Sequence, residues 1–177
     1  MKVLMVVAPV NFQDREYEDT RKELENAGIG IETASTRAGT CTGRFGGKVE
    51  AKALGEMKAD DFDAIIFIGG PGTPLVRADE KAVKLAQEFS GKGKLVCAIC
   101  WASTILAKAG ILVNKRATLW VGFDGEYGKS TDEMLSDEGA IVERKPVVID
   151  GKIITADGPA HASVFGREIA KALKTQG

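Results

Sequence analysis

The sequence has only one histidine and three cysteines, no surplus of either charge and no long apolar run. Lysine and arginine together number 24 against 25 aspartates and glutamates, so the formal charge of -1 offers no general attraction to nucleic acid or to an anionic membrane. No apolar stretch approaches the roughly 18 residues that a membrane-spanning helix needs. Three cysteines are too few for a secreted disulfide framework and fit a reducing compartment. We therefore expect a cytoplasmic protein that binds neither nucleic acid nor membrane.

Asparagine and glutamine are also scarce, with three of each beside abundant lysine and glutamate, and this bias points to a thermophilic source. The chain shows no internal repeat and no linker rich in proline and serine. Its 177 residues, 44% hydrophobic and 28% charged, have the composition of one globular domain. We expect a single domain over residues 1–177.

Short apolar runs alternate along the chain with segments of helical period, and this alternation is typical of an α/β fold in which helices flank a parallel sheet. The pattern predicts strands at 2–8, 30–35, 64–68 and 95–99, and helices at 15–27, 79–90, 101–109 and 162–173. It also predicts a hairpin-like passage over 46–54 and a hairpin in which Asp150-Gly151 joins strands at 147–149 and 152–155.

The most informative segment is residues 94–104, which read KLVCAICWAST. A buried strand passes there into a helix within one or two residues, and this predicts a nucleophile elbow at Cys100, with the small residues Ala98 and Ala102 on either side. A thiol at a helix N-terminus is expected to have a lowered pKa, because the helix dipole favours the thiolate. The alternative is an ordinary buried cysteine of the core.

Four stretches in this order resemble the ThiJ/PfpI superfamily: FQDRE at 12–16, IGGPG at 68–72, AICWA at 98–102 and TADGPA at 155–160. The resemblance covers nearly the whole chain. It implies a flavodoxin-like three-layer α/β sandwich with a mostly parallel central sheet and a nucleophile elbow, as in class I glutamine amidotransferases. It also implies a reactive cysteine, no cofactor, no metal and assembly as a homo-oligomer, either a dimer or a hexamer.

The resemblance assigns roles to four residues. Cys100 matches the nucleophile, and Glu16 matches a glutamate on the first helix that hydrogen-bonds the thiol. Because two adjacent negative charges would repel each other, this pair functions only if Glu16 is protonated, and the two groups then titrate as a unit. Glu18 is the rival, and a solvated helix face is the alternative reading of both glutamates. Gly70 and Trp101 match the residues whose backbone N–H groups stabilise an oxyanion, although a glycine loop can also be a plain turn.

The chain departs from PfpI-type proteases at Trp101, where those proteins have a histidine. His161 is the only histidine, so a Cys-His pair must use it or does not exist. A histidine at a helix start is otherwise a surface or capping residue.

Other residues are weaker candidates for a functional role. Cys97 and Cys100 form a C-x-x-C string, but extended geometry holds the two residues too far apart for a disulfide, and no second ligand pair suggests a metal. We interpret Cys97 as a core residue and Cys41 as a loop residue. The aromatic residues Trp120, Phe123 and Tyr127 line the pocket mouth or belong to the core.

The sequence thus predicts a cofactor-free cysteine hydrolase or lyase in which Cys100, Glu16 and His161 are catalytic and Gly70 and Trp101 bind the oxyanion. By resemblance, its substrates are small reactive carbonyls such as methylglyoxal, or glycated amines and thiols. Two alternatives remain: a PfpI-like cysteine peptidase or amidase that acts on peptides, and a non-catalytic oxidative-stress sensor or chaperone with an oxidisable Cys100.

Overall fold

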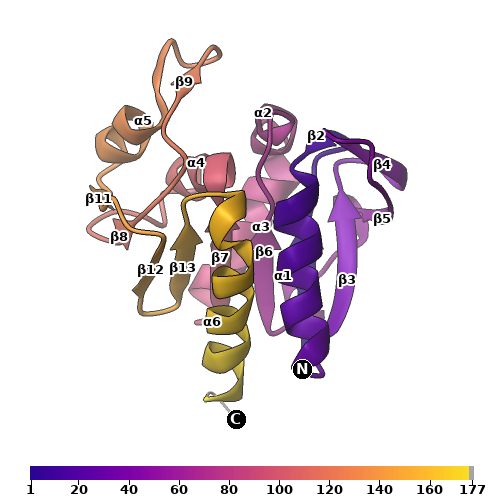
Figure 1. Ribbon diagram of the computed structural model, residues 1–177. Coiled ribbons are helices and arrows are strands. Elements are labelled where there is room, and N and C mark those ends of the chain that lie inside the picture. Colours follow the sequence, from indigo (N-terminus) through magenta and orange to yellow (C-terminus); the bar gives the residue numbers. More distant parts are fainter. Residues whose placement is uncertain (176–177) are drawn as a thin grey trace.

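A nine-stranded sheet forms the centre of the computed structural model, which describes residues 1–175 (Figure 1). The strands lie in the order β12-β13-β7-β6-β1-β3-β5-β4-β2, and every neighbouring pair is parallel except β12–β13 and β4–β5. Their bounds are β1 (Lys2–Val6), β2 (Val10–Phe12), β3 (Gly30–Ser35), β4 (Gly39–Gly43), β5 (Lys48–Ala53), β6 (Ala64–Phe67), β7 (Leu95–Ile99), β12 (Val147–Asp150) and β13 (Ile153–Ala156). The predicted α/β class with a mostly parallel sheet is confirmed.

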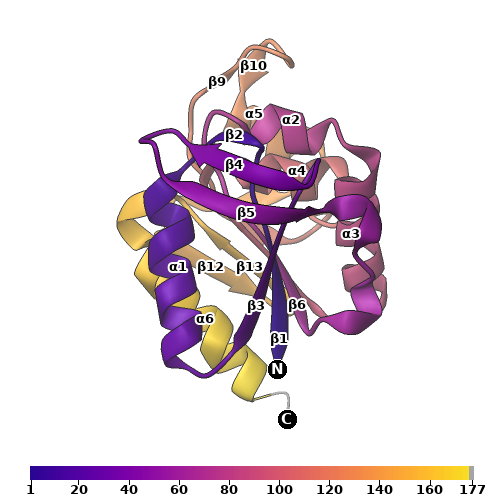
Figure 2. The ribbon, with the colours of Figure 1, turned by 90° about the vertical axis from the view of Figure 1, so that its right-hand side faces the viewer.

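Helices cover both faces of this sheet. Figure 2 shows α1 and α6 on one side and α3 on the other. The helices are α1 (Asp14–Asn26), α2 (Thr73–Arg77), α3 (Glu80–Gly91), α4 (Ser103–Lys108), α5 (Thr131–Asp137) and α6 (Ala162–Lys174), with 3-10 turns η1 (Leu54–Glu56), η2 (Ala59–Asp61), η3 (Cys100–Ala102) and η4 (Pro159–His161). None of the helices in residues 1–175 is both long enough and apolar enough to cross a membrane.

The central strands β6 and β7 are apolar throughout and fully buried, because helices cover them on both faces. Parallel pairing brings the carboxyl ends of these strands to one edge of the sheet, the upper edge in Figure 1. Phe67 pairs with Ala98, and Ile99 pairs with Ala156. Continuing this register places Cys100 between the chain that leaves β6 and the chain that leaves β13. In open α/β sheets this edge is where ligands bind.

The predicted strands and helices are present, with ends displaced by a few residues at most. Several parts were not predicted, among them the strands β2 and β4, since the predicted hairpin-like passage at 46–54 begins after β4. The short helix α2 follows the glycine loop and carries Pro74 in its first turn, where proline is tolerated. The segment 111–146 contains β8 (Arg116–Ala117), β9 (Phe123–Asp124), β10 (Lys129–Ser130), α5 and β11 (Ile141–Val142), and its β9–β10 hairpin projects beyond the carboxyl edge of the sheet (Figure 1). These strands are too short to give a readable period.

Candidate active site

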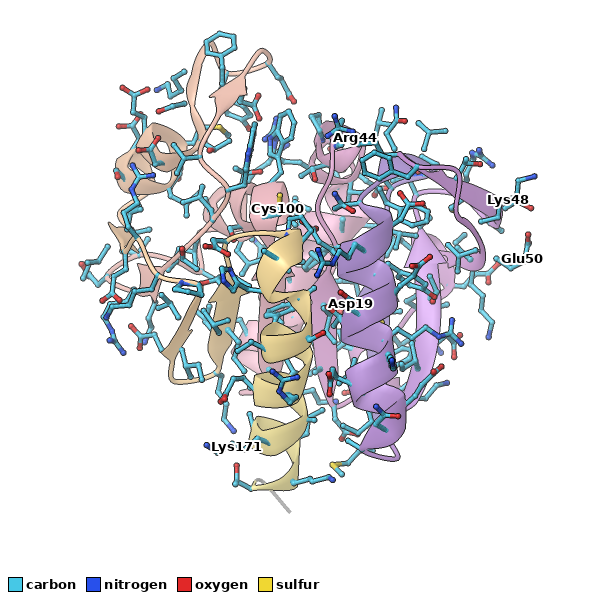
Figure 3. All side chains as sticks on the ribbon, viewed as in Figure 1. Asp19, Arg44, Lys48, Glu50, Cys100 and Lys171 are labelled. Carbon is cyan, nitrogen blue, oxygen red and sulfur yellow. The ribbon has the colours of Figure 1, made fainter. Side chains whose placement is uncertain are left out.

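Cys100 is the first residue after β7, and its backbone bends sharply there. Its φ is +63°, a left-handed conformation that a residue with a side chain adopts only under strain. The side chain is almost buried, with 8% of the residue exposed, and Figure 3 labels it at the carboxyl edge of the sheet. The chain then enters η3 and the helix α4. This is the strand-to-helix geometry that the sequence predicts at Cys100.

Glu16 lies on the buried face of α1 and reaches the same place. It is fully buried, its Oε2 accepts a hydrogen bond from the Gly69 backbone N–H at 2.9 Å, and its Oε1 has no hydrogen-bond partner in the described chain. Desolvation by burial raises the pKa of Glu16 from its ordinary 4.5 to about 8, although the nearby Cys100 thiol and the hydrogen bond from the Gly69 N–H oppose this. Glu18, by contrast, is exposed. The reading of Glu16 as part of a solvated face is therefore wrong.

Gly69 leaves the space in which the thiol and the carboxyl group meet. A Cβ at this position would lie 2.8 Å from the Cys100 Cβ, 2.8 Å from Glu16 Oε2 and 2.7 Å from the Ile99 carbonyl oxygen. No larger residue fits without displacing these groups, so the glycine loop does more than turn the chain.

Two backbone N–H groups near the Cys100 sulfur, one from Gly70 and one from Trp101, lower the pKa of its thiol. Gly70 can point its N–H there because its φ is +111°, a conformation that glycine adopts readily. Both residues are those that the family resemblance implies for an oxyanion site. The donors lie against the sulfur in this structure, where they favour its charged form.

The expected lowering of the Cys100 pKa is wrong. Burial raises the pKa of the thiol, the negative charge of Glu16 raises it further, and the N–H groups of Trp101 and Gly70 only partly oppose this. The helix that follows explains the error: α4 has six residues after a 3-10 turn, so its dipole is weak beside the desolvation of a nearly buried sulfur. Cys100 therefore holds its proton in the resting site.

The side chain of Trp101 points to the β9–β10 hairpin. Its Nε1–H donates to Asp124 Oδ2 at 2.8 Å, and its ring packs against Trp120 with 5.0 Å between ring centroids. Trp120, Phe123 and Tyr127 are 37%, 68% and 40% exposed, so the alternative that they are core residues is wrong. Sequence reasoning missed Asp124, because it lies in a two-residue strand without a motif.

His161 lies in η4 and forms a pair with Asp157, with 2.7 Å between His161 Nδ1 and Asp157 Oδ1. Asp157 follows β13 directly and stands beside Cys100 in the strand register. Within residues 1–175, no hydrogen bond joins His161 to Cys100. A cavity of about 300 Å³ next to this pair is lined by Trp120, Asp157 and the cationic side chains of Arg144 and Lys145, among others. The cavity thus lies between Trp120 and Asp157, the partner of His161.

The other two cysteines are free and fully buried. Cys97 belongs to the core of β7, as expected, and burial raises the pKa of its thiol. The placement of Cys41 in a loop is wrong, since it lies in β4 with its side chain facing the core. Neither residue contributes to the Cys100 site.

Known proteins match nearly the full length of this chain in both sequence and structure. A sequence profile of the DJ-1/PfpI family matches residues 1–172. A protein of Methanocaldococcus jannaschii is 38% identical over 98% of this chain and 82% of its own length. Deglycase PfpI of Pyrococcus furiosus is 31% identical over 98% of this chain and 100% of its own length. The crystal structure of a ThiJ/PfpI domain protein from Brachyspira murdochii has a TM-score of 0.90 and 30% identity, and the match covers 98% of this chain and 96% of that one.

Proposed function

Because this chain belongs to the DJ-1/PfpI family, we propose that it is a cysteine-dependent enzyme in which Cys100 attacks the carbonyl carbon of a small reactive aldehyde or a glycated group. One observation carries the proposal: a nearly buried thiol, a fully buried carboxyl group and two backbone N–H donors converge at one point of the sheet edge. A core cysteine needs none of these partners.

The addition step uses these groups in turn. With a pKa of about 8, Glu16 is mostly protonated near neutral pH, as expected for the pair, and the addition starts from its ionised fraction. The Glu16 carboxylate takes the proton of the Cys100 thiol as the sulfur attacks, so an S–H bond breaks and an S–C bond forms. The carbonyl oxygen becomes an oxyanion, the N–H groups of Gly70 and Trp101 stabilise it, and Glu16 returns the proton to it. The product is a hemithioacetal, and the net change is addition of the thiol across the carbonyl group. A pKa of about 8 suits Glu16 to both directions of transfer near neutral pH.

The surroundings of Cys100 favour a small substrate. The thiol is only slightly exposed, and the indole of the next residue, Trp101, packs against Trp120. An aldehyde expels no leaving group, so the pair of Cys100 and Glu16 is sufficient for its addition. In addition, PfpI of P. furiosus is named a deglycase, which is an activity on glycated groups.

The test compares turnover of methylglyoxal by the wild-type protein, Cys100→Ser and Glu16→Gln, with intact-protein mass recorded beside it. We expect turnover in the wild-type protein, none in Cys100→Ser, and a loss of at least about tenfold in Glu16→Gln, because general acid–base groups typically contribute about 100-fold or more. Turnover that survives Cys100→Ser would overturn the proposal. A stable adduct on Cys100 without turnover would favour the sensor alternative.

The pair of His161 and Asp157 favours amide hydrolysis as a second candidate function. A carboxylate that holds an imidazole is the arrangement that prepares histidine as a general base, and expulsion of an amine requires such a group. Trp101 cannot serve, because its indole offers only an N–H donor. We expect little cleavage of a peptide amide, and complete loss of any cleavage in His161→Ala. Strong cleavage that persists in His161→Ala would contradict this role of His161.

A further inference from the structure

A fully buried ion pair lies behind the elbow, outside the set of residues that the family resemblance implies. Arg77 is the last residue of α2 and Asp124 lies in β9; the side chains of both are 0% exposed. The guanidinium binds the carboxylate through two bonds, Nη1 to Oδ2 at 2.7 Å and Nη2 to Oδ1 at 3.1 Å. Such a bidentate pair is strongly oriented, and it persists away from water only where other hydrogen bonds complete it.

Those other hydrogen bonds converge on Trp101 by two routes. Asp124 Oδ2 accepts from the indole Nε1–H of Trp101 at 2.8 Å. Arg77 Nη1 donates to Thr104 Oγ1 at 3.0 Å, and the Thr104 hydroxyl donates to the Trp101 carbonyl oxygen at 2.8 Å. A single guanidinium therefore fixes both the ring and the backbone carbonyl of Trp101. This closed ring of bonds leaves Trp101 little freedom to rotate.

Trp101 is the residue whose orientation matters most to the elbow. It follows Cys100 directly, and the left-handed φ of Cys100 is a strained conformation that persists only where the surrounding structure supports it. Its backbone N–H is one of the two beside the Cys100 sulfur that lower the pKa of the thiol. A shift of the backbone at Trp101 would move that N–H away from the sulfur.

We propose that the buried Arg77–Asp124 pair positions Trp101 and so aims the Trp101 backbone N–H at the Cys100 sulfur. Arg77, Asp124 and Thr104 are positioning residues, because they act through Trp101 and touch no reacting atom. The claim that these residues matter for catalysis rests on the proposed function. Their effect on the reactivity of the Cys100 thiol does not depend on it. The reactivity of Cys100 toward a simple electrophile is therefore the proper measurement.

The experiment measures the rate of Cys100 alkylation by iodoacetamide in the full-length protein between pH 6 and pH 10, with the modified residue identified by mass spectrometry. The main variants are Trp101→Phe, which removes the Nε1 donor, and Thr104→Val, which removes the hydroxyl; neither changes the charge. The matched control is Glu126→Gln. Glu126 also binds Arg77 Nη2, at 2.7 Å, but its side chain is 48% exposed and none of its bonds in the described chain involves Trp101.

We expect both main variants to slow alkylation at pH 8 by roughly fivefold, the factor that corresponds to one ordinary hydrogen bond, and to need a higher pH than the wild-type protein to reach the same rate. Glu126→Gln should match the wild-type protein. Asp124→Asn should also slow the reaction, although loss of a negative charge by itself favours a thiolate, and it should add nothing in the Trp101→Phe background. If Asp124→Asn does not fold, the two uncharged variants still decide the question.

Main variants that react like Glu126→Gln at every pH would overturn the positioning role while leaving the proposed function intact. A wild-type Cys100 that reacts no faster than Cys41 and Cys97 would overturn both. A main variant that loses reactivity together with its fold, judged by circular dichroism, would also count against the proposal, because the pair would then serve stability alone.

Discussion

Burial of Glu16 makes the stability of the protein depend on pH in a direction opposite to that of most carboxyl groups. The folded protein holds the Glu16 proton up to about pH 8, whereas the ordinary pKa of 4.5 describes the unfolded chain. Below about pH 4.5 Glu16 is protonated in both the folded and the unfolded protein, so it does not lower the free energy of unfolding. As the pH rises, the unfolded chain releases the proton first, so the free energy of unfolding falls until the folded carboxyl group also ionises near pH 8.

The size of this fall follows from the two pKa values. At about 1.4 kcal/mol per pH unit, the interval from 4.5 to about 8 corresponds to a total of about 5 kcal/mol, of which about 3 to 4 kcal/mol is lost between pH 5 and pH 8. Glu16→Gln should remove this loss, because glutamine has no charge to bury and its carbonyl oxygen can still accept from the Gly69 N–H. The variant should therefore be the more stable protein at pH 8.

The assay is urea unfolding of the wild-type protein and Glu16→Gln at pH 5 and pH 8, and the quantity of interest is the difference between their two changes with pH. This double difference cancels the titrating groups that do not interact with Glu16. Glu18→Gln is the matched control, since it removes a carboxyl group from an exposed position of the same helix. Equal pH dependence in the wild-type protein and Glu16→Gln would refute the argument that a buried, proton-holding Glu16 faces Cys100.

Three further predictions concern the same site. Sub-stoichiometric alkylation should label Cys100 before Cys41 and Cys97, because those two residues are 0% exposed. Peptide mass spectrometry measures the order of labelling, and earlier labelling of Cys41 or Cys97 would contradict a reactive Cys100 at the elbow. Gly69→Ala should destabilise the protein by about 1–3 kcal/mol in urea unfolding and abolish turnover. Gly55→Ala is the control and should leave stability unchanged, because a Cβ at Gly55 would meet no atom within 4 Å. The kcat/KM for methylglyoxal should rise through about pH 8 as Glu16 ionises, and a profile that is flat from pH 6 to pH 9 would contradict a proton-accepting Glu16.

The parts of the site that sequence predicts well are those fixed by local order. The strand of residues 95–99 is apolar at every position and ends in small residues, so the position of Cys100 follows from a short window. The choice between Glu16 and Glu18 was also within reach of the sequence. Glu16, Thr20 and Leu24 are spaced four apart and share one face of α1, and the apolar Leu24 marks that face as buried.

The parts that sequence reasoning missed depend on contacts between distant segments. Arg77 and Asp124 are 47 residues apart, and β9 has only two residues, so no local period marks the hairpin that meets Trp101. The error on the Cys100 pKa has the same origin. A helix start is visible in sequence, whereas the burial of the sulfur is supplied by α1 and the glycine loop, which approach from elsewhere in the chain.

The burial of Glu16, which lowers the stability of the folded protein at high pH, also makes this residue useful as a proton carrier. An exposed glutamate with an ordinary pKa near 4.5 would be ionised at neutral pH, but it would be too weak a base to take the proton of a thiol efficiently. Burial moves the pKa to about 8, where the group can both accept and return a proton. The sheet edge supplies the rigid support for this arrangement, because the neighbouring strands β6 and β7 are fully buried and fix the glycine loop and Cys100 relative to each other. The loss of stability near pH 8 and the proton transfer at Cys100 are thus two measurements of the same buried carboxyl group.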